Sequence, residues 1–272
     1  VMALSGAPLP ASDRRMLDAF AAQAAAVLER NRLEARAADA TRLRESDAVR
    51  TALLAAVSHD LRTPLAGIKA SVATLQDPTI DLPESDRAAL LESAAEAADR
   101  LDSLLSNLLD LSRIQTGAVR PILEPVSLDE VLQRALRGLP EDSVHDETDE
   151  HLPLVVTDAG LLERAVANLV ENAVRHSPEG QPVRLCAAVV PDQRMQLRIV
   201  DRGPGVAPDD RERMFKPFQR LGDVPAGSGV GLGLAVARGL AEAVGATLDA
   251  EDTPGGGLTM VVSIPLAGGG PS

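Results

Sequence analysis

Aromatic residues and cysteine are nearly absent from this sequence of 272 residues. It holds three Phe, no Trp and no Tyr, so Ala, Leu and Val must fill its cores, which favours close packing between helices. The single cysteine, Cys186, excludes an intrachain disulfide framework and any metal site built from several cysteines. Because Cys186 lies in the apolar run PVRLCAAVV, we expect a small core side chain there.

Basic charge and long apolar runs are also scarce. The sequence has 27 Lys and Arg against 40 Asp and Glu, a formal net charge of −13. Proteins that bind nucleic acid or anionic membranes usually carry basic patches, so this charge argues against both partners. An anionic ligand must instead be held locally, by backbone N–H groups or by a cation. The sequence contains no run of about 18 apolar residues and no signal-peptide pattern.

The first part of the chain has the composition of long helices. Helix formers dominate over residues 12–75, and prolines interrupt them over residues 78–83. Ser85 or Asp86 is predicted to cap a second helix, which stops near Gly117. This helix repeats apolar residues at three- and four-residue spacing: Leu90, Leu91, Ala94, Ala98, Leu101, Leu104, Leu105, Leu108 and Leu111. Two antiparallel helices with such seams form half of a four-helix bundle, so we expect a homodimer.

From Val119 onward, strands and helices are mixed. LPLVVTD reads as a strand and is followed by a predicted helix over Ala159–His176. VRLCAAVV and MQLRIVDRG read as adjacent strands, ATLDAED and LTMVVSIPL as the last two, and a further helix is expected over Leu234–Val244. PILEPVSLDEVLQRALRG reads as a strand leading into a helix. This mixture predicts an α+β sandwich behind the helical hairpin.

The stretch SHDLRTPLAGI places a histidine and a proline within a predicted helix. His59 falls away from the apolar seam of that helix, beside Asp60, and Thr63 follows one turn later on the same side. The Asp60 carboxylate could take the imidazole Nδ1 proton and leave Nε2 free as a nucleophile. Pro64 removes one helical hydrogen bond and permits a bend. The alternative is a surface histidine beside an incidental kink.

Three polar residues of the helix over Ala159–His176 share one face. Asn168, Asn172 and Arg175 recur at i, i+4 and i+7, although asparagine is a poor helix former. An asparagine carbonyl oxygen is a hard ligand that suits Mg²⁺, which also binds phosphates. The alternative is a solvated polar stripe.

Glycine-rich turns follow two of the predicted elements. Asp201 ends a strand before Gly203 and Gly205, where a carboxylate can accept a hydrogen bond from an exocyclic amine. Four alternating glycines then precede a helix: Gly227, Gly229, Gly231 and Gly233. Backbone N–H groups at such a loop form an anion site. The spacing matches neither the dinucleotide-binding motif nor the P-loop.

Taken together, these motifs resemble a bacterial two-component sensor histidine kinase, in family order. SHDLRTPL resembles the phosphoacceptor box, NLVENAVRHSP the asparagine box and DRGPG the first glycine box. MFKPFQR resembles the phenylalanine box and GSGVGLGLAVA the second glycine box, so the resemblance spans residues 45–266. The run VRTALLAAVSHDLRTPLAGI is also similar to the potassium- and osmotic-responsive branch, which controls a high-affinity potassium uptake operon.

The resemblance implies a fold and a reaction. The fold is a long-helix hairpin forming a dimeric four-helix bundle, followed by an α/β-sandwich ATP-binding domain of the GHKL type. The reaction is autophosphorylation of His59 from Mg-ATP, with Asp60 as neighbouring base, and transfer to an aspartate on a response regulator receiver domain. Thr63 matches the position that orients water when relatives dephosphorylate the regulator.

The resemblance also assigns the ATP site. Asn172 would ligate Mg²⁺ with support from Asn168, Arg175 would lie near the phosphates, and Asp201 would read the adenine amine. His176 stands where many relatives carry an aromatic residue, and we expect it to replace part of that contact. The pocket would be shaped by the glycines of both boxes and their neighbour: Gly203, Gly205, Gly227, Gly229, Gly231, Leu232 and Gly233.

Residues 219–228 resemble the mobile lid over ATP, from which Arg220 could reach a phosphate. The implied organisation is a remnant of an upstream sensory domain (1–34), a signalling helix (35–48), the dimerisation and phosphotransfer hairpin (49–118), a linker (119–126), the catalytic ATP-binding domain (127–267) and a disordered tail (268–272). The expected location is cytoplasmic, with membrane attachment only through parts of a longer parent protein.

Two other functions stay open on the sequence. A related ATPase, resembling the heat-shock chaperones or mismatch-repair ATPases, would share the nucleotide fold without a phosphorylated histidine, and the His59–Asp60 pair counts against it. A degenerate kinase acting as a dimeric scaffold is the second, and the presence of Asn172 and Asp201 weighs against it.

Overall fold

The computed structural model describes residues 22, 23, 29, 58, 60–140, 142–149, 151–219 and 231–268. Two compact units divide the chain, Val1–Ala56 and Val57–Ser272, and nearly all described residues belong to the second. His59, Arg220, Gly227 and Gly229 lie outside the described residues. So do the signalling helix and nearly all of the upstream segment expected from the sequence, together with residues 269–272 of the expected tail.

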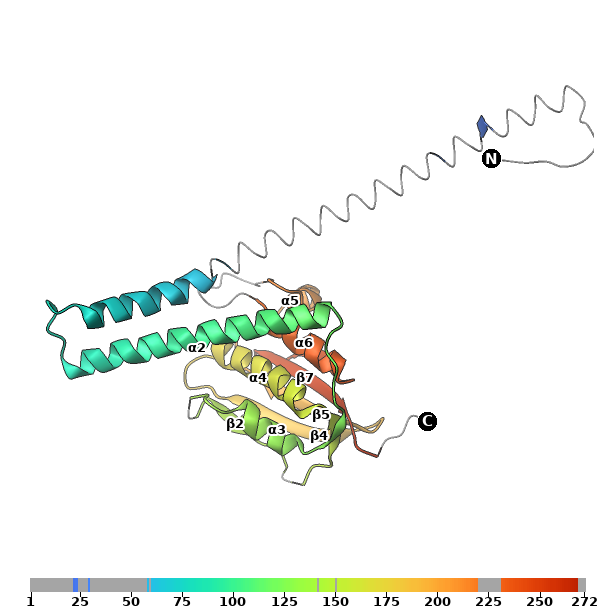
Figure 1. The fold of residues 1–272 in the computed structure, drawn as a ribbon. Helices are drawn as coiled ribbons and strands as arrows, with labels where there is room; N and C mark the ends of the chain where they lie inside the picture. The colour runs from blue at the N-terminus through green and yellow to red at the C-terminus, as the bar shows by residue number, and fades with distance from the viewer. Residues whose placement is uncertain are drawn as a thin grey trace, which may run out of the picture. The chain divides into compact units, whose positions relative to one another are not determined.

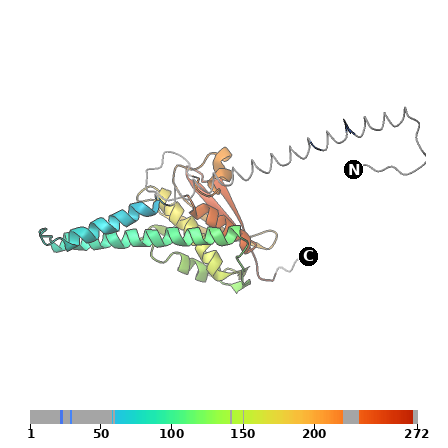
Figure 2. The same ribbon diagram turned by 45° about the horizontal axis from the view of Figure 1, so that its top comes forward.

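A helical hairpin opens the second unit. Its first helix is described over residues 60–76, and α2 (Glu84–Gln115) returns beside it (Figures 1 and 2). The helix α2 begins at Glu84 after Pro83, so the prediction that Ser85 or Asp86 caps it is wrong: both lie inside its first turn. Pro83 suits this place because its missing N–H would have no helical partner. No helix in the described part of the chain is long and apolar enough to cross a membrane.

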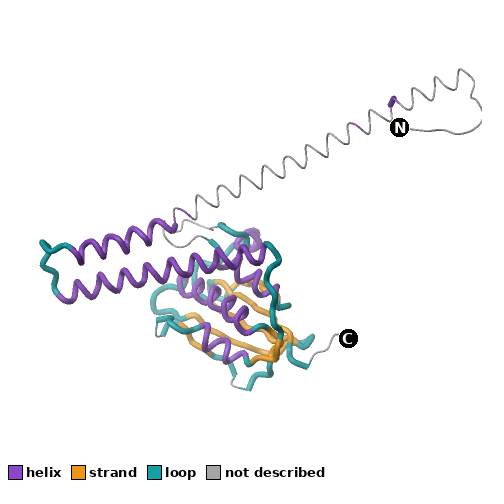
Figure 3. Tube along the Cα trace, in the orientation of Figure 1, coloured by secondary structure: helices purple, strands orange, loops and turns teal. Residues whose placement is uncertain are grey.

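A five-stranded mixed sheet follows, with strand order β2-β4-β5-β7-β6. Its strands are drawn in orange in Figure 3. The strands are β2 (Val144–Asp146), β4 (Val183–Val190), β5 (Arg194–Val200), β6 (Thr247–Asp252) and β7 (Leu258–Pro265). All pairs are antiparallel except β2–β4, which is parallel. A separate antiparallel pair joins β1 (Glu124–Val126) to β3 (Val155–Thr157). The sequence predicted the last four strands of the large sheet but not the short edge strand β2.

Three helices cover one face of this sheet: α3 (Leu128–Ala135), α4 (Ala159–His176) and α6 (Gly233–Ala243) (Figure 1). Residues of β5 alternate between fully buried and half-buried, as expected when one face packs on helices. The main core lies between the two layers and includes Leu162, Val166, Leu169, Leu185, Leu197, Met260 and Val262. The predicted helical hairpin and α/β sandwich are confirmed, and α4 has the predicted bounds.

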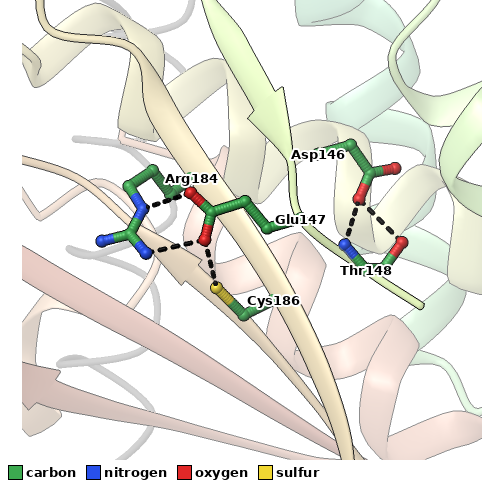
Figure 4. A network of polar contacts seen from close by, with 5 residues as sticks. All are labelled: Asp146, Glu147, Thr148, Arg184 and Cys186. Atoms are coloured by element: carbon green, nitrogen blue, oxygen red, sulfur yellow. Dashed lines mark hydrogen bonds and ion pairs between the residues drawn. The ribbon is translucent and has the colours of Figure 1, made fainter.

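The expectation of a core side chain at Cys186 is wrong. Cys186 is only half-buried, because Leu185 before it on β4 points into the helix-covered core and successive side chains of a strand point to opposite faces. The Cys186 thiol lies 3.5 Å from Glu147 Oε2, and Arg184 holds the same carboxylate through bonds of 2.7 and 2.6 Å (Figure 4). Burial and the Glu147 carboxylate raise the pKa of the thiol, so Cys186 stays protonated and donates.

Candidate functional site

Asp158 sets the position of α4, the helix that carries the predicted asparagines. Its Oδ1 caps the helix by accepting from the Leu161 N–H at 3.1 Å, which satisfies a donor left open at the first turn. Its Oδ2 accepts from the Ile122 N–H at 2.9 Å. One carboxylate thus fastens the linker that follows the hairpin to the start of α4. Sequence reasoning missed this residue, although an Asp directly before a predicted helix is a recognised cap signal.

Asn168 and Asn172 lie half-buried on one face of α4. The Nδ2 of Asn168 donates to the Arg164 carbonyl at 3.0 Å. Its Oδ1 faces α6 so closely that a Cβ at Gly233 would stand 3.2 Å from it. The Asn172 carboxamide makes no hydrogen bond within the residues that the structure describes, so its oxygen is available to a ligand.

The far end of α4 abuts the turn after β5. A Cβ at position 203 would stand 2.7 Å from the His176 carbonyl oxygen, so only glycine fits at Gly203 without a shift. Burial and the positive charge of Arg175 lower the pKa of His176, while Asp201 opposes them. The imidazole is therefore neutral at pH 7. The structure thus places the predicted residues His176, Asp201 and Gly203 together.

Asp201 is a buried carboxylate with one oxygen in use. It is 4% exposed, and its Oδ1 accepts from the N–H groups of Gly203 at 2.8 Å and Leu258 at 2.9 Å. Its Oδ2 accepts no hydrogen bond within the part of the chain that the structure describes. Because this oxygen is not sealed in the core, it can accept from a ligand that brings an N–H group.

Gly257, which the sequence analysis did not single out, packs against Asp201. A Cβ there would lie 2.1 Å from the Asp201 carbonyl oxygen, and its φ of 113° favours glycine. Gly205 approaches the same residue, since its Cβ would meet the Gly257 carbonyl at 3.2 Å. The sequence offered only the run PGGGL as a signal, which is ordinary for a turn. The pairing of the turns at 203–205 and 255–257 is a tertiary feature.

Residues on either side of the predicted lid (219–228) are held together. The N–H of Phe218 donates to the Gly231 carbonyl at 2.8 Å, and Phe218 adopts a left-handed conformation with a φ of 64°. Leu232 is buried and Gly233 begins α6. Ahead of the lid, Arg238 lies 4.2 Å from the Phe215 ring centroid and pairs with Glu212 at 3.0 Å, anchoring α5 (Arg211–Met214) to α6.

The predicted phosphoacceptor region lies on the first hairpin helix. Asp60 is half-buried and Thr63 is exposed there, while His59 lies outside the described residues. The nucleotide residues come from different elements, α4, the turn after β5 and the start of α6. The sequence-predicted site is therefore two groups of residues, one on the hairpin and one on the sandwich.

The donor set on the sandwich fits Mg-ATP. Asn172 and the Oδ1 of Asn168 offer neutral oxygens, and Mg²⁺ typically binds one or two protein oxygens, phosphates and several waters. No cluster of three or more His, Cys, Asp or Glu side chains that could hold a metal occurs among the described residues. An ion here would thus depend on the nucleotide for most of its negative ligands.

Two family descriptions match the chain. Residues 49–117 match the His Kinase A (phospho-acceptor) domain. Residues 157–268 match the histidine kinase-, DNA gyrase B- and HSP90-like ATPase. The two matches cover the hairpin and the sandwich, respectively.

Individual relatives agree with these matches. The sensor protein KdpD of Mycobacterium tuberculosis is 42% identical over 97% of this chain, which spans 31% of that protein's length. The signal transduction histidine-protein kinase/phosphatase MprB of Mycobacterium ulcerans is 33% identical over 79% of this chain and 43% of its own length. Among solved structures, the Acinetobacter baumannii histidine kinase AdeS has a TM-score of 0.58 and 26% identity, over 76% of this chain and 98% of AdeS.

Proposed function

Because this chain belongs to the sensor histidine kinases, in the branch of the KdpD sensor proteins, we propose that its ATP-binding domain phosphorylates His59 of its own hairpin. The observation that carries the proposal is the half-used carboxylate of Asp201 in the turn that meets the end of α4 at His176. One Asp201 oxygen is fixed by two backbone N–H groups, and the other is available to an adenine amine. Asn168 and Asn172 offer their oxygens from the same helix, α4.

The chemistry follows from these roles. Nε2 of His59 attacks the γ-phosphorus of ATP, so the N–P bond forms as the bond to the β–γ bridging oxygen breaks and ADP leaves. The Asp60 carboxylate takes the Nδ1 proton, which neutralises the charge that would otherwise build on the ring. A bound Mg²⁺ supplies charge neutralisation on the phosphates. Catalysis then consists of positioning and electrostatics, which is what phosphoryl transfer requires.

The phosphoryl group then passes to an aspartate carboxylate on a response regulator. The Thr63 hydroxyl, exposed one turn after His59, suits a role in orienting water when the regulator is dephosphorylated. MprB, a kinase/phosphatase by name, supports such a double activity. Membership of the KdpD branch supports potassium or osmotic signalling as the biological setting.

A homodimer follows from an apolar stripe on α2. Leu91, Leu105 and Leu109 are 57%, 48% and 59% exposed, and their spacing of fourteen and four residues places them on one side of the helix. A second copy would bury this stripe, and in a twofold dimer each leucine is buried twice. The phospho-acceptor domain match supports the same assembly.

Substituting Leu109→Asp should therefore raise the dimer dissociation constant by at least about 100-fold, because two leucine contacts of roughly 2 kcal/mol each are lost. Sedimentation velocity over a concentration series measures this change. Leu123→Asp is the matched control, since Leu123 is 51% exposed but precedes β1 in the sandwich. A Leu109→Asp variant that dimerises as tightly as the control would contradict the proposed seam.

The experiment that tests the kinase function is incubation with Mg²⁺ and γ-labelled ATP. Label that is acid-labile and alkali-stable supports a phosphohistidine. If ATP binds but no label is incorporated, the chain is a scaffold rather than a kinase core, and the proposed function is wrong.

A further inference from the structure

One face of α2 packs against the ATP-binding sandwich. Its Asp110 is 4% exposed and forms an ion pair with Arg164 of α4. Its apolar residues on the same face join a second core cluster, separate from the main one: Leu104, Leu111 and Ile114 of α2 with Leu161, Ala165, Phe218, Leu232, Val236 and Leu240 of the sandwich. This cluster includes Phe218 and Leu232, which lie on either side of the predicted lid.

The sandwich comes close to α2 near the C-terminal end of that helix. A Cβ at Gly239 of α6 would stand 2.8 Å from two carbons of the Ile114 side chain. Glycine therefore lets α6 approach α2 more closely than any other residue would. Ion pair, apolar cluster and glycine contact together fix which side of α2 faces the sandwich.

Asn107 lies at the centre of that face. At about 100° per residue, Leu104 lies one turn before it and Asp110 and Leu111 one turn after it, all on the same side of α2. The side chain is half-buried. Its carboxamide makes no hydrogen bond within the residues that the structure describes, so a buried face of the hairpin presents an amide that lacks a partner.

Two pairs of charges give the direction of α2 along α4. Asp110 meets Arg164, and Arg100 is close enough to act on Arg175. Desolvation lowers the pKa of the Arg175 guanidinium, Glu171 raises it, and the charge of Arg100 lowers it. Arg100 precedes Asp110 on α2, whereas Arg175 follows Arg164 on α4, so the two helices run past each other in opposite directions.

The apolar cluster places Asn107 near Asn168 of the proposed nucleotide site. Leu104 and Leu111, which flank Asn107 on α2, share that cluster with Ala165 and Leu232. Asn168 lies three residues after Ala165 on α4, and its Oδ1 lies close to Gly233, the neighbour of Leu232.

We propose that Asn107 of the hairpin is a third asparagine of the Mg-ATP site, whose carboxamide N–H donates to the terminal phosphate of ATP held by α4. The proposal rests on the proposed function, since it needs ATP in the pocket of Asp201. It gives the hairpin a direct contact with the γ-phosphate, so that the domain contact distinguishes ATP from ADP. Asn107 is then a binding residue supplied by the domain that is to be phosphorylated.

The test compares ATP and ADP affinities of the Asn107→Ala chain by calorimetry with Mg²⁺ present. We expect ATP binding to weaken about tenfold, the loss of one hydrogen bond to a charged group, with ADP binding unchanged. Asn107→Asp should weaken ATP binding further, because it places a negative charge against the phosphate. Gln115→Ala, which removes an exposed amide from the same helix, should alter neither affinity.

The measured ATP and ADP affinities show whether Asn107 contacts the terminal phosphate. Equal losses for ATP and ADP in Asn107→Ala, or no loss for either, would overturn the role of Asn107. Circular dichroism melting of each variant checks that the hairpin stays folded, and Asn107→Ser supplies a second variant with a small polar side chain. If the unsubstituted chain binds neither nucleotide, the proposed function itself fails. That result differs from an Asn107→Ala variant whose ATP and ADP affinities are unchanged, which overturns only the role of Asn107.

Discussion

Replacing His59 by Gln should abolish transfer of phosphate from ATP to the protein while leaving ATP binding intact. Glutamine has no ring nitrogen with a free lone pair, so the N–P bond cannot form, and the fall in labelling should exceed about 1,000-fold. The proposed ATP site, at Asp201 and the α4 asparagines of the sandwich, is not touched by the substitution. The measurement is incorporation of γ-label together with a nucleotide dissociation constant for the same preparation.

His151→Gln is the matched control for this change. His151 is an exposed histidine in the connector between β2 and β3, with its imidazole 3.6 Å from Asp149. We expect the control to label as fast as the unsubstituted chain. Label that is alkali-stable and acid-labile in His59→Gln would mean that another residue is the phosphoacceptor.

Replacing Asp201 by Asn should weaken ATP binding by about 30-fold or more while the protein stays folded. The asparagine Oδ1 can still accept from Gly203 and Leu258, so the turn keeps its two backbone hydrogen bonds. In the proposed site the Oδ2 acceptor becomes an N–H₂ donor opposite the adenine amine, so a charged hydrogen bond of roughly 2 kcal/mol would be lost. Isothermal titration calorimetry measures the affinity.

A change of base preference distinguishes a loss of adenine recognition from general damage to the nucleotide site. Inosine triphosphate carries a carbonyl where ATP carries the amine, so Asp201→Asn should narrow or reverse the preference for ATP over inosine triphosphate. Asp249→Asn, at an exposed position of β6, is the control and should leave both affinities unchanged. An equal loss for both nucleotides would show that Asp201 supports the pocket without reading the base.

The sequence predicted the local elements well because each carries its own pattern. The helix α4 has the predicted bounds because an apolar face with the period of a helix follows directly after the capping residue Asp158. The strand β4 was predicted from the apolar-alternating run VRLCAAVV, and its bounds are Val183–Val190 as expected. The short strand β2 carries no such run, so only its pairing with β4 identifies it.

The candidate site also has features that the sequence predicts and features that only the structure shows. Asn172, Asp201 and the glycine boxes were candidates from the sequence because their residue types and order resemble the family. The use of one Asp201 oxygen by two backbone N–H groups depends on β7 lying beside β5, and the sequence does not reveal it. The same holds for Gly257, which closes on Asp201 from a turn 56 positions further along the chain.

What the sequence determined by itself was therefore the periodic helices and strands, the family and the candidate residues, since each depends on near neighbours along the chain. Only the tertiary structure decided which groups meet across elements. Asp158 joins the linker to α4, Arg164 reaches Asp110, and Asn107 faces the sandwich from the hairpin. The first two contacts join residues 36 and 54 positions apart, and packing rather than local propensity selects them.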